Sequence, residues 1–192
     1  MAIESINLGT APNDGTGDDL RSGGNKVNKN FEEVLTFTGG AQYIDDFYKE
    51  SNPLIIQEGS RVKLTCDNDT VIDGNVPPEF SGTMWNPNTN KLVAVNDKDR
   101  FITEIRFKAK NSVLSGFFDI EIDIGGTQNV ISKQSEVFTK SANNEQSFKT
   151  VFVYFTGATF IENGGDIFIT ALNGDMSIYD IEIVPTRIHK GR

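Results

Sequence analysis

Clusters of carboxylates are the first residues in this sequence that could do chemistry. Asp14, Asp18 and Asp19 stand among glycines, and Asp67 and Asp69 form a second group. Such hard oxygen ligands suit Ca²⁺, but the twelve-residue loop with a terminal Glu is absent. Asp in turn-rich runs also makes Asx turns and helix caps. We favour turns and caps and predict no metal site, with a calcium loop as the alternative.

A third group of carboxylates alternates along a predicted strand. Asp119, Glu121 and Asp123 would share one face, with neighbours about 6.6 Å apart at the rise of a strand. That spacing reaches the lower end of the separation between the two carboxyl groups of inverting glycosidases. Nothing in the sequence indicates a raised pKa for an acid catalyst. An acidic outer face is therefore the preferred interpretation, with a glycan depolymerase as the enzymatic alternative.

Other routes to catalysis find no support in the residues. The Gly-rich run "GTAPNDGTGDD" lacks the Gly-Lys-Ser/Thr of a phosphate loop. The single cysteine, Cys66, lies in an alternating segment that predicts a small buried side chain, and the single histidine, His189, lies near the last residue. We predict that the protein is not an enzyme, with no catalytic residues and no cofactor.

Sugar binding is the remaining chemical hypothesis. Trp85 and Asn86 lie in the turn-rich stretch "SGTMWNPNTN". An exposed Trp there would stack on a sugar ring, whereas a buried Trp would close one end of the core. A buried Trp85 is the preferred interpretation, and Trp85 and Asn86 are our possible glycan contacts as the alternative.

Most of the chain from residue 41 onward predicts strands. Apolar and polar residues alternate there with a period of two, and short Gly/Asn/Asp-rich turns separate the alternating segments. The predicted strands are 61–67, 91–95, 100–109, 116–125, 129–139, 147–155, 166–172 and 177–188. Helical crossovers are missing, so the pattern predicts a mainly β protein, a β-sandwich of the jelly-roll type.

Two of these strands are apolar on both faces. Val151, Val153 and Phe155 alternate with apolar residues at 152 and 154, and Tyr179 belongs to a weaker version of the pattern in the last strand. A strand that is apolar on both faces is covered on both faces. We predict that Val151, Val153, Phe155 and Tyr179 contact a neighbouring subunit in a homotrimer. Cover by the long loop 70–90 is the alternative.

Residues 1–40 differ from the rest of the chain. A turn-rich arm leads to a predicted helix, where Thr16 and Asp19 have capping-box spacing and "TGG" at 38–40 ends the helix. Two glycines at 23 and 24 weaken that helix. We predict a docking arm and helix over 1–40 and a β-sandwich head over 41–192. The predicted docking residues are Ile6, Leu8, Leu20, Gly24, Val27, Phe31 and Leu35.

The overall charge excludes one large class of partner. The formal net charge is −9, which disfavours binding to a phosphate backbone because such binding needs Lys and Arg to displace counterions. The sequence contains no run of roughly 18 apolar residues that would predict a membrane span. The first ten residues lack the basic and apolar regions of a signal peptide, so we expect synthesis in the cytoplasm.

The N-terminal stretch also resembles a known family. "INLGTAPNDGTGDDLR" followed by "NKVNKNFEEV" is similar to the N-terminal module of tailed-bacteriophage virion proteins, including fibre and other appendage proteins. The departure is Ser22-Gly23-Gly24, where such proteins more often carry bulkier helix formers. The final strands look like those of small phage jelly rolls and of trimeric tumour-necrosis-factor-like sandwiches. Such likeness in fold does not by itself specify a function.

The resemblance implies a non-enzymatic structural protein of the phage virion, made in the host cytoplasm. The expected partners are other virion proteins, such as capsid, neck, tail or baseplate proteins, which would hold the arm of a trimeric fibre or decoration protein. The alternative is a receptor-binding module that attaches to host-surface glycans. Neither interpretation includes nucleic acid or membrane as a partner.

Overall fold

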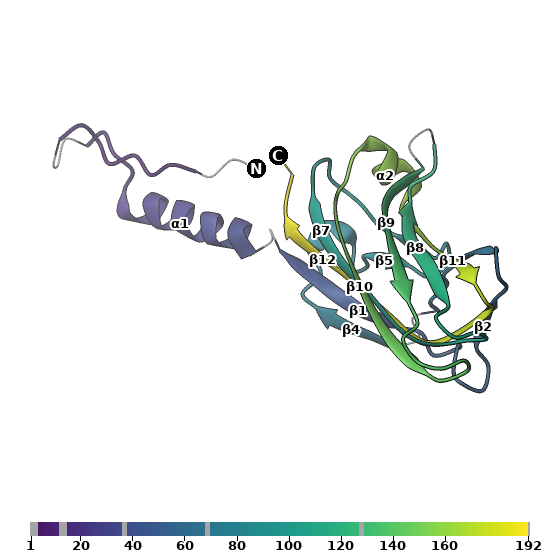
Figure 1. Ribbon diagram of the computed structural model, residues 1–192. Coiled ribbons are helices and arrows are strands. Elements are labelled where there is room, and N and C mark those ends of the chain that lie inside the picture. Colours follow the sequence, from purple (N-terminus) through teal and green to yellow (C-terminus); the bar gives the residue numbers. More distant parts are fainter. Residues whose placement is uncertain (1–3, 12–14, 36–37, 68–69, 127–128, 192) are drawn as a thin grey trace.

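The computed structural model describes residues 4–11, 15–35, 38–67, 70–126 and 129–191. It consists of a β-sandwich and an N-terminal arm that leads into helix α1 (Leu20–Leu35). Figure 1 shows the arm and α1 extending away from the sandwich, beside the end where strand β1 begins and strand β12 ends. Gly39 at the start of β1 pairs with Arg187 near the end of β12.

Two antiparallel sheets form the sandwich. The large sheet has the order β10 (Gln146–Phe155), β7 (Arg100–Asn111), β12 (Met176–His189), β1 (Gly39–Ile44) and β4 (Thr70–Gly74), with β2 (Leu54–Ile56) also paired to β12. The small sheet has the order β3 (Arg61–Lys63), β11 (Asp166–Asn173), β8 (Phe117–Asp123) and β9 (Val130–Val137). The chain crosses between the two sheets at the connections β2–β3, β3–β4, β7–β8, β9–β10, β10–β11 and β11–β12. This topology confirms the predicted jelly roll.

Short elements complete the architecture. They are the 3₁₀ helix Pro78–Phe80, the hairpin of β5 (Trp85–Asn86) and β6 (Lys91–Leu92), and helix α2 (Ala158–Asn163). All eight predicted strands appear, although 61–67 and 91–95 are shorter than expected. Sequence reasoning missed β1, β2, β4 and α2: β1 opens with two glycines that read as a helix stop, and α2 is too short to display a helical period.

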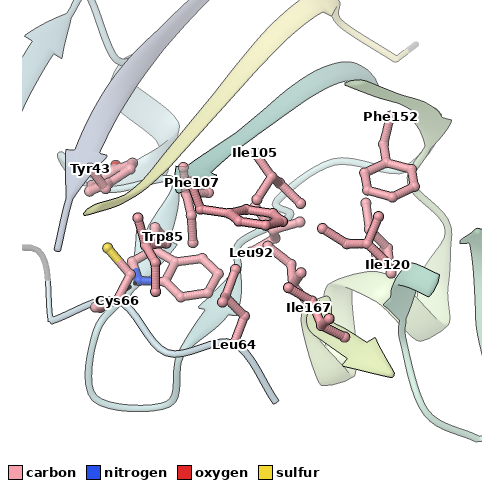
Figure 2. Close-up of a cluster of buried hydrophobic side chains, with 14 of the residues drawn as sticks. Tyr43, Leu64, Cys66, Trp85, Leu92, Ile105, Phe107, Ile120, Phe152 and Ile167 are labelled. Carbon is pink, nitrogen blue, oxygen red and sulfur yellow. Dashed lines mark hydrogen bonds between the residues drawn. The ribbon is translucent and has the colours of Figure 1, made fainter. Parts of the chain in front are cut away.

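The core lies between the two sheets and follows the predicted alternation. On β8, Phe118, Ile120 and Ile122 are fully buried, as their shared face predicts. Figure 2 shows side chains from both sheets meeting around Phe107, with Trp85 beside Cys66. Cys66 is buried as a small apolar side chain, as expected. This continuous core holds the strands in the register that positions the outer surfaces.

Candidate functional site

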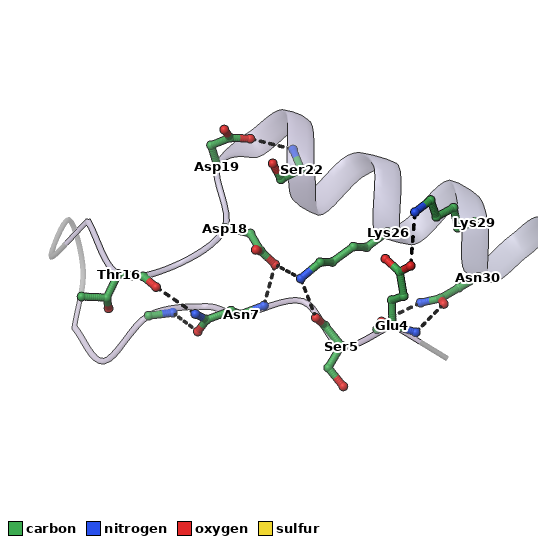
Figure 3. A network of polar contacts seen from close by, with 11 residues as sticks. Glu4, Ser5, Asn7, Thr16, Asp18, Asp19, Ser22, Lys26, Lys29 and Asn30 are labelled. Atoms are coloured by element: carbon green, nitrogen blue, oxygen red, sulfur yellow. Dashed lines mark hydrogen bonds and ion pairs between the residues drawn. The ribbon is translucent and has the colours of Figure 1, made fainter. Parts of the chain in front are cut away.

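The N-terminal arm folds back on itself through polar contacts of Asn7 (Figure 3). The Asn7 amide donates to Asp18 Oδ2 at 2.8 Å, and the Asp18 amide donates to the Asn7 carbonyl at 2.8 Å. The Asn7 side chain donates to the Thr16 carbonyl at 2.8 Å and accepts from the Gly9 amide at 3.0 Å. The Asn- and Asp-rich sequence therefore satisfies its own backbone groups, as turn residues do. We call residues 4–11 and 15–19 together with α1 the hook.

Gly17 lets the two segments of the arm, residues 4–11 and 15–19, approach each other closely. A Cβ atom at this position would lie 2.9 Å from the Asn7 carbonyl oxygen and 2.9 Å from the carbonyl carbon of Leu8. Real Cβ atoms essentially never approach other heavy atoms so closely, and here the neighbours are backbone atoms. The hairpin therefore requires glycine at this point for reasons of space.

Asp19 caps helix α1. Its Oδ1 accepts from the Ser22 amide at 2.6 Å, which satisfies one of the unpaired donors of the first turn. This hydrogen bond lowers the pKa of Asp19. The expected pairing of Thr16 with Asp19 as a capping box is wrong, because the Thr16 hydroxyl accepts from the Thr10 amide at 3.3 Å instead.

Lys26 and Asn30, two polar side chains of α1, hold the arm against the helix (Figure 3). Lys26 Nζ lies 2.7 Å from Asp18 Oδ2 and donates to the Ser5 carbonyl at 3.1 Å. The hydrogen bonds from Lys26 and from the Asn7 amide lower the pKa of Asp18. One turn further on, Asn30 accepts from the Glu4 amide and donates to the Glu4 carbonyl, both at 2.9 Å.

The apolar stripe of α1 remains open to solvent on a different side of the helix. Leu20 is 95% exposed and Phe31 is 64% exposed, while Val27 is half-buried. These three residues lie at spacings of seven and four, which places them on one face of a helix. Leu8, in the arm, is 88% exposed and Ile6 is also exposed. The side chain of Leu35 lies outside the described part of the chain.

Gly24 lies on this stripe, and no heavy atom lies within 4 Å of the point where a Cβ would stand. Gly23, in contrast, faces the arm, where a Cβ would lie 3.6 Å from the Cγ2 of Ile6. Within the hook, close approach therefore occurs at Gly17, whereas Gly23 has only ordinary van der Waals contact with the arm. Gly24 leaves a flat area between Leu20 and Val27 where the surface of another protein could contact the helix backbone.

The predicted subunit-contact residues divide into two groups. Val151 is half-buried, and Val153 and Phe155 are exposed on the outward face of β10. Tyr179 is different: it is buried within the single chain, and its hydroxyl donates to Glu145 Oε2 at 2.7 Å. Its expected place among exposed contact residues is therefore wrong. Asp180, with a φ of 51°, lies in an irregular stretch of the β12–β7 pairing that breaks the alternation assumed for this strand.

The hypothesis that Trp85 stacks on a sugar ring requires an exposed indole, and this requirement is not met. Trp85 is fully buried, and its Nε1 donates to the Cys66 carbonyl at 3.1 Å. Asn86 Oδ1 accepts from the Asn88 amide at 3.0 Å, so this side chain stabilises its own turn. The hairpin of β5 and β6 places the indole in the core, and Leu92 of this hairpin forms a bridge with the distant Gly165.

The carboxylates of β8 are engaged by cations. Arg61 donates to Glu121 and to Asp123, the latter at 2.6 Å, and Lys133 forms an ion pair with Asp119. Burial opposes ionisation of Asp119, but hydrogen bonds from Lys133 and from a nearby serine lower its pKa overall. A lowered pKa is the reverse of what a general acid needs. The outer face here is less exposed than predicted, because the cations cover Asp119 and Glu121.

The described residues include no group of three or more His, Cys, Asp or Glu side chains arranged to hold a metal ion. Asp14 and Asp69, two of the candidate calcium ligands, lie outside the described residues. Asp18 and Asp19 instead serve the hook, and Asp67 Oδ1 accepts from the Asp46 amide at 3.0 Å. Within the described part of the chain, no helix is long and apolar enough to cross a membrane.

Sequence reasoning missed a buried ion cluster at the end of the sandwich nearest α1. Arg187 is fully buried and donates to Glu79 Oε1 at 2.8 Å and to Asp99 Oδ2 at 3.2 Å. Its guanidinium lies 5.3 Å from the ring centroid of Phe80. The only sequence signal is an arginine at a core-facing position of the last strand. The cluster fixes the end of β12 beside the start of β1, where the hook leaves the sandwich.

Comparison with known proteins divides the chain into two parts. Residues 4–45 match the family described as "Bacteriophage T4 gp9/10-like protein, N-terminal". No match was found among curated protein sequences. The family match covers the hook and β1, so it coincides with the stretch whose sequence resembles phage virion proteins.

Several solved structures are similar to this chain over most of its length, at low sequence identity and with TM-scores below 0.5. An Eiger TNF from S. frugiperda has 11% identity and a TM-score of 0.48, covering 81% of this chain and 96% of that one. The globular domain of zebrafish complement 1qA has 6% identity and a TM-score of 0.47, covering 80% and 99%. The PRD1 vertex protein P5 has 12% identity and a TM-score of 0.44, covering 79% and 73%. The chain therefore joins an N-terminal segment that matches the T4 gp9/10-like bacteriophage family to a jelly-roll β-sandwich.

Proposed function

We propose that this chain is a non-enzymatic, trimeric appendage or decoration protein that the hook anchors to another protein of the phage particle. The observation that carries the proposal is the open apolar stripe of α1 within a segment that matches a phage virion family. The arm occupies an adjacent side of the helix through Lys26 and Asn30. The hook thus presents one defined apolar face and keeps its polar groups paired internally.

Burial of that face supplies the anchoring energy. Leu20, Val27 and Phe31 would each contribute about 1.5–3 kcal/mol when fully removed from water, before the costs of association. The flat area at Gly24 lets a partner surface approach the helix backbone. In a trimer, three hooks would bind together, and their linkage would raise the apparent affinity without any new kind of contact.

Removal of the hook tests the proposal. A protein lacking residues 1–37 should remain a soluble, folded trimer but should fail to join the particle during assembly in infected cells. Phe31→Asp in the full chain should give the same defect, because it places a charge on the apolar stripe. Asn25→Asp adds the same charge at an exposed position of α1 that lies further round the helix from the stripe, and it serves as the matched control.

Incorporation is measured as the amount of this protein in purified particles. Normal incorporation of the Phe31→Asp protein would contradict docking through the stripe. Loss of the folded head on deletion of residues 1–37 would contradict the division into hook and head. Host-glycan recognition, the alternative role, lacks the exposed Trp85 that motivated it, and a glycan array with the intact protein tests it separately.

A further inference from the structure

We propose that the two opposite edges of the large sheet bind each other between copies of this chain, so that the copies close head to tail into a ring. This inference deepens the trimer of the proposed function and rests on it for the number of copies. It depends on three features of the outward face of the large sheet: a ridge on β10, a groove on β1 and β4, and their matching heights along the strands.

The ridge is the outward face of edge strand β10. Val153 is 49% exposed and Phe155 is 63% exposed, and the half-buried Val151 continues their row. The Arg100 guanidinium lies 5.4 Å from the ring centroid of Phe155 and supports one side of the ring. Adjacent exposed apolar side chains on an edge strand are a feature that soluble proteins generally cover by association.

The groove lies at the opposite edge of the same sheet. Gly40 of β1 pairs with Gly74 of β4, so two neighbouring positions carry no side chain. The resulting depression of about 380 Å³ is lined by these glycines together with Ile72, Val184 and Thr186 among others. A Cβ on Gly40 would lie 2.5 Å from the Pro185 carbonyl oxygen, so packing against β12 keeps this position a glycine.

The ridge and the groove lie at the same positions along the strand direction, because paired residues connect them across the sheet. The pairing places Val153, Ile102, Thr186, Gly40 and Gly74 in one row across the sheet. One row further along, Val151 stands at the β10 edge and Ile72, paired with Gln42, at the β4 edge. In the first row the β10 edge carries Val153 and the β4 side carries the hollow at the two glycines. In the second row the β10 edge carries Val151 and the β4 edge carries Ile72.

The next row adds complementary charge. Lys149 stands at the β10 edge, and Thr70 stands at the β4 edge, where its hydroxyl donates to Asp46 Oδ2 at 2.7 Å. Hydrogen bonds from Thr70 and Lys49 lower the pKa of Asp46, and Lys49 Nζ lies 3.2 Å from Asp46 Oδ1. In the proposed contact Lys149, which also lies 3.0 Å from Glu104 of its own chain, would come near Asp46 of the next copy.

These matched heights point to a second copy as the partner. Rotation about an axis parallel to the strands moves no residue along that axis, so each row of one copy meets the same row of the next. When one patch on each copy binds a different patch on the next copy, the copies form a closed ring if the repeated rotation returns to the first copy. An unrelated partner would need no correspondence between the two edges of one sheet.

Mixing of variants in the full chain tests this arrangement. Val153→Asp changes the ridge, and Ile72→Asp, at a residue 52% exposed, changes the groove edge. Each variant alone should weaken association at least about 10-fold, the effect of losing a central apolar contact. An equimolar mixture should form 1:1 dimers, because the intact ridge of one variant binds the intact groove of the other while the ring cannot close. Sedimentation velocity gives the mass as a multiple of the 21.2 kDa chain.

Val137→Asp is the matched control, since it makes the same change at an exposed valine of β9 in the small sheet, and it should leave the mass unchanged. Circular dichroism checks that each variant is folded, and Phe155→Asp replaces Val153→Asp if the latter unfolds. A monomeric parent protein, oligomers that survive both ridge and groove changes, or dissociation by ridge variants alone would each overturn the proposal. Anchoring by the hook is measured separately by incorporation into particles, so either proposal can fail without the other.

Discussion

Arg187 shows how a single buried charge is stabilised in this protein. Its guanidinium is fully buried and bonds to Asp99 and Glu79, and Lys190 also lies 2.9 Å from Glu79. Asp99 Oδ1 in turn accepts from the Gly191 amide at 2.7 Å. A buried charge is tolerated only when it is paired and hydrogen-bonded, so loss of one partner leaves an uncompensated charge.

Glu79 gives this cluster a defined pH dependence. Burial opposes its ionisation, but Lys190 and Arg187 lower its pKa from 4.5 to about 2. A lowered pKa stabilises the folded state above the unfolded value, so this contribution is present above pH 4.5 and is lost as the pH falls toward 2. Glu79→Gln should therefore reduce the free energy of unfolding at pH 7 by up to about 3 kcal/mol.

Denaturant unfolding at pH 7 and at pH 2.5 measures this effect. The difference between the parent protein and the Glu79→Gln variant should shrink at the lower pH, because pH 2.5 lies well below the unfolded pKa of 4.5 and near the folded pKa of about 2, where most of this stabilisation is lost. Glu162→Gln, at an exposed residue of α2, is the control. A difference that is the same at both pH values would show that Glu79 acts through its shape and not through its charge.

At the scale of the element, the hook combines a tight hairpin with a helix of low intrinsic stability. Gly17 is required by space, whereas Gly24 stands inside the helix with nothing near it. Glycine in a helix costs about 1 kcal/mol relative to alanine. The two positions therefore predict opposite effects of the same substitution, although both carry glycine in the same segment.

Gly17→Ala should open the hairpin, and Gly24→Ala should stabilise α1 by about 1 kcal/mol. Hydrogen exchange of the Asp18 amide, which donates to the Asn7 carbonyl, reports on the hairpin. Its protection should be lost in the Gly17→Ala variant and kept or increased in the Gly24→Ala variant. Retained protection in the Gly17→Ala variant would mean that the arm does not pack as closely as described.

At the scale of the whole molecule, Trp85 belongs to the core that joins the two sheets. It is the largest fully buried side chain, and Figure 2 shows it between Cys66 and the residues around Phe107. Truncation of a buried aromatic residue typically costs about 3–5 kcal/mol. Trp85→Ala should therefore lower the free energy of unfolding by that amount, and its effect on any ligand would follow from lost stability.

Chemical denaturation measures this effect, with Leu114→Ala as the control because Leu114 is a large apolar residue exposed in a loop. The control should change the free energy of unfolding by less than about 0.5 kcal/mol, as surface substitutions generally do. An equally small effect of Trp85→Ala would contradict the burial described for the indole.

Local sequence patterns determined the class of the fold and the nature of its first segment. Alternation on β8 predicted that Phe118, Ile120 and Ile122 face the core, because side chains of a strand point alternately to its two faces. Turn residues such as Asn7 and Asp18 predicted an arm that satisfies its own backbone. Such patterns are local, so they survive in a single sequence without knowledge of which strands meet.

Only the tertiary structure decided which surfaces are covered. The irregular pairing near Asp180 buries Tyr179, and the hairpin of β5 and β6 turns Trp85 inward. Arg61 comes from another strand to cover the carboxylates of β8. Each outcome depends on contacts with segments distant in sequence, because burial is a property of the assembled sheets and local alternation specifies only two opposite faces.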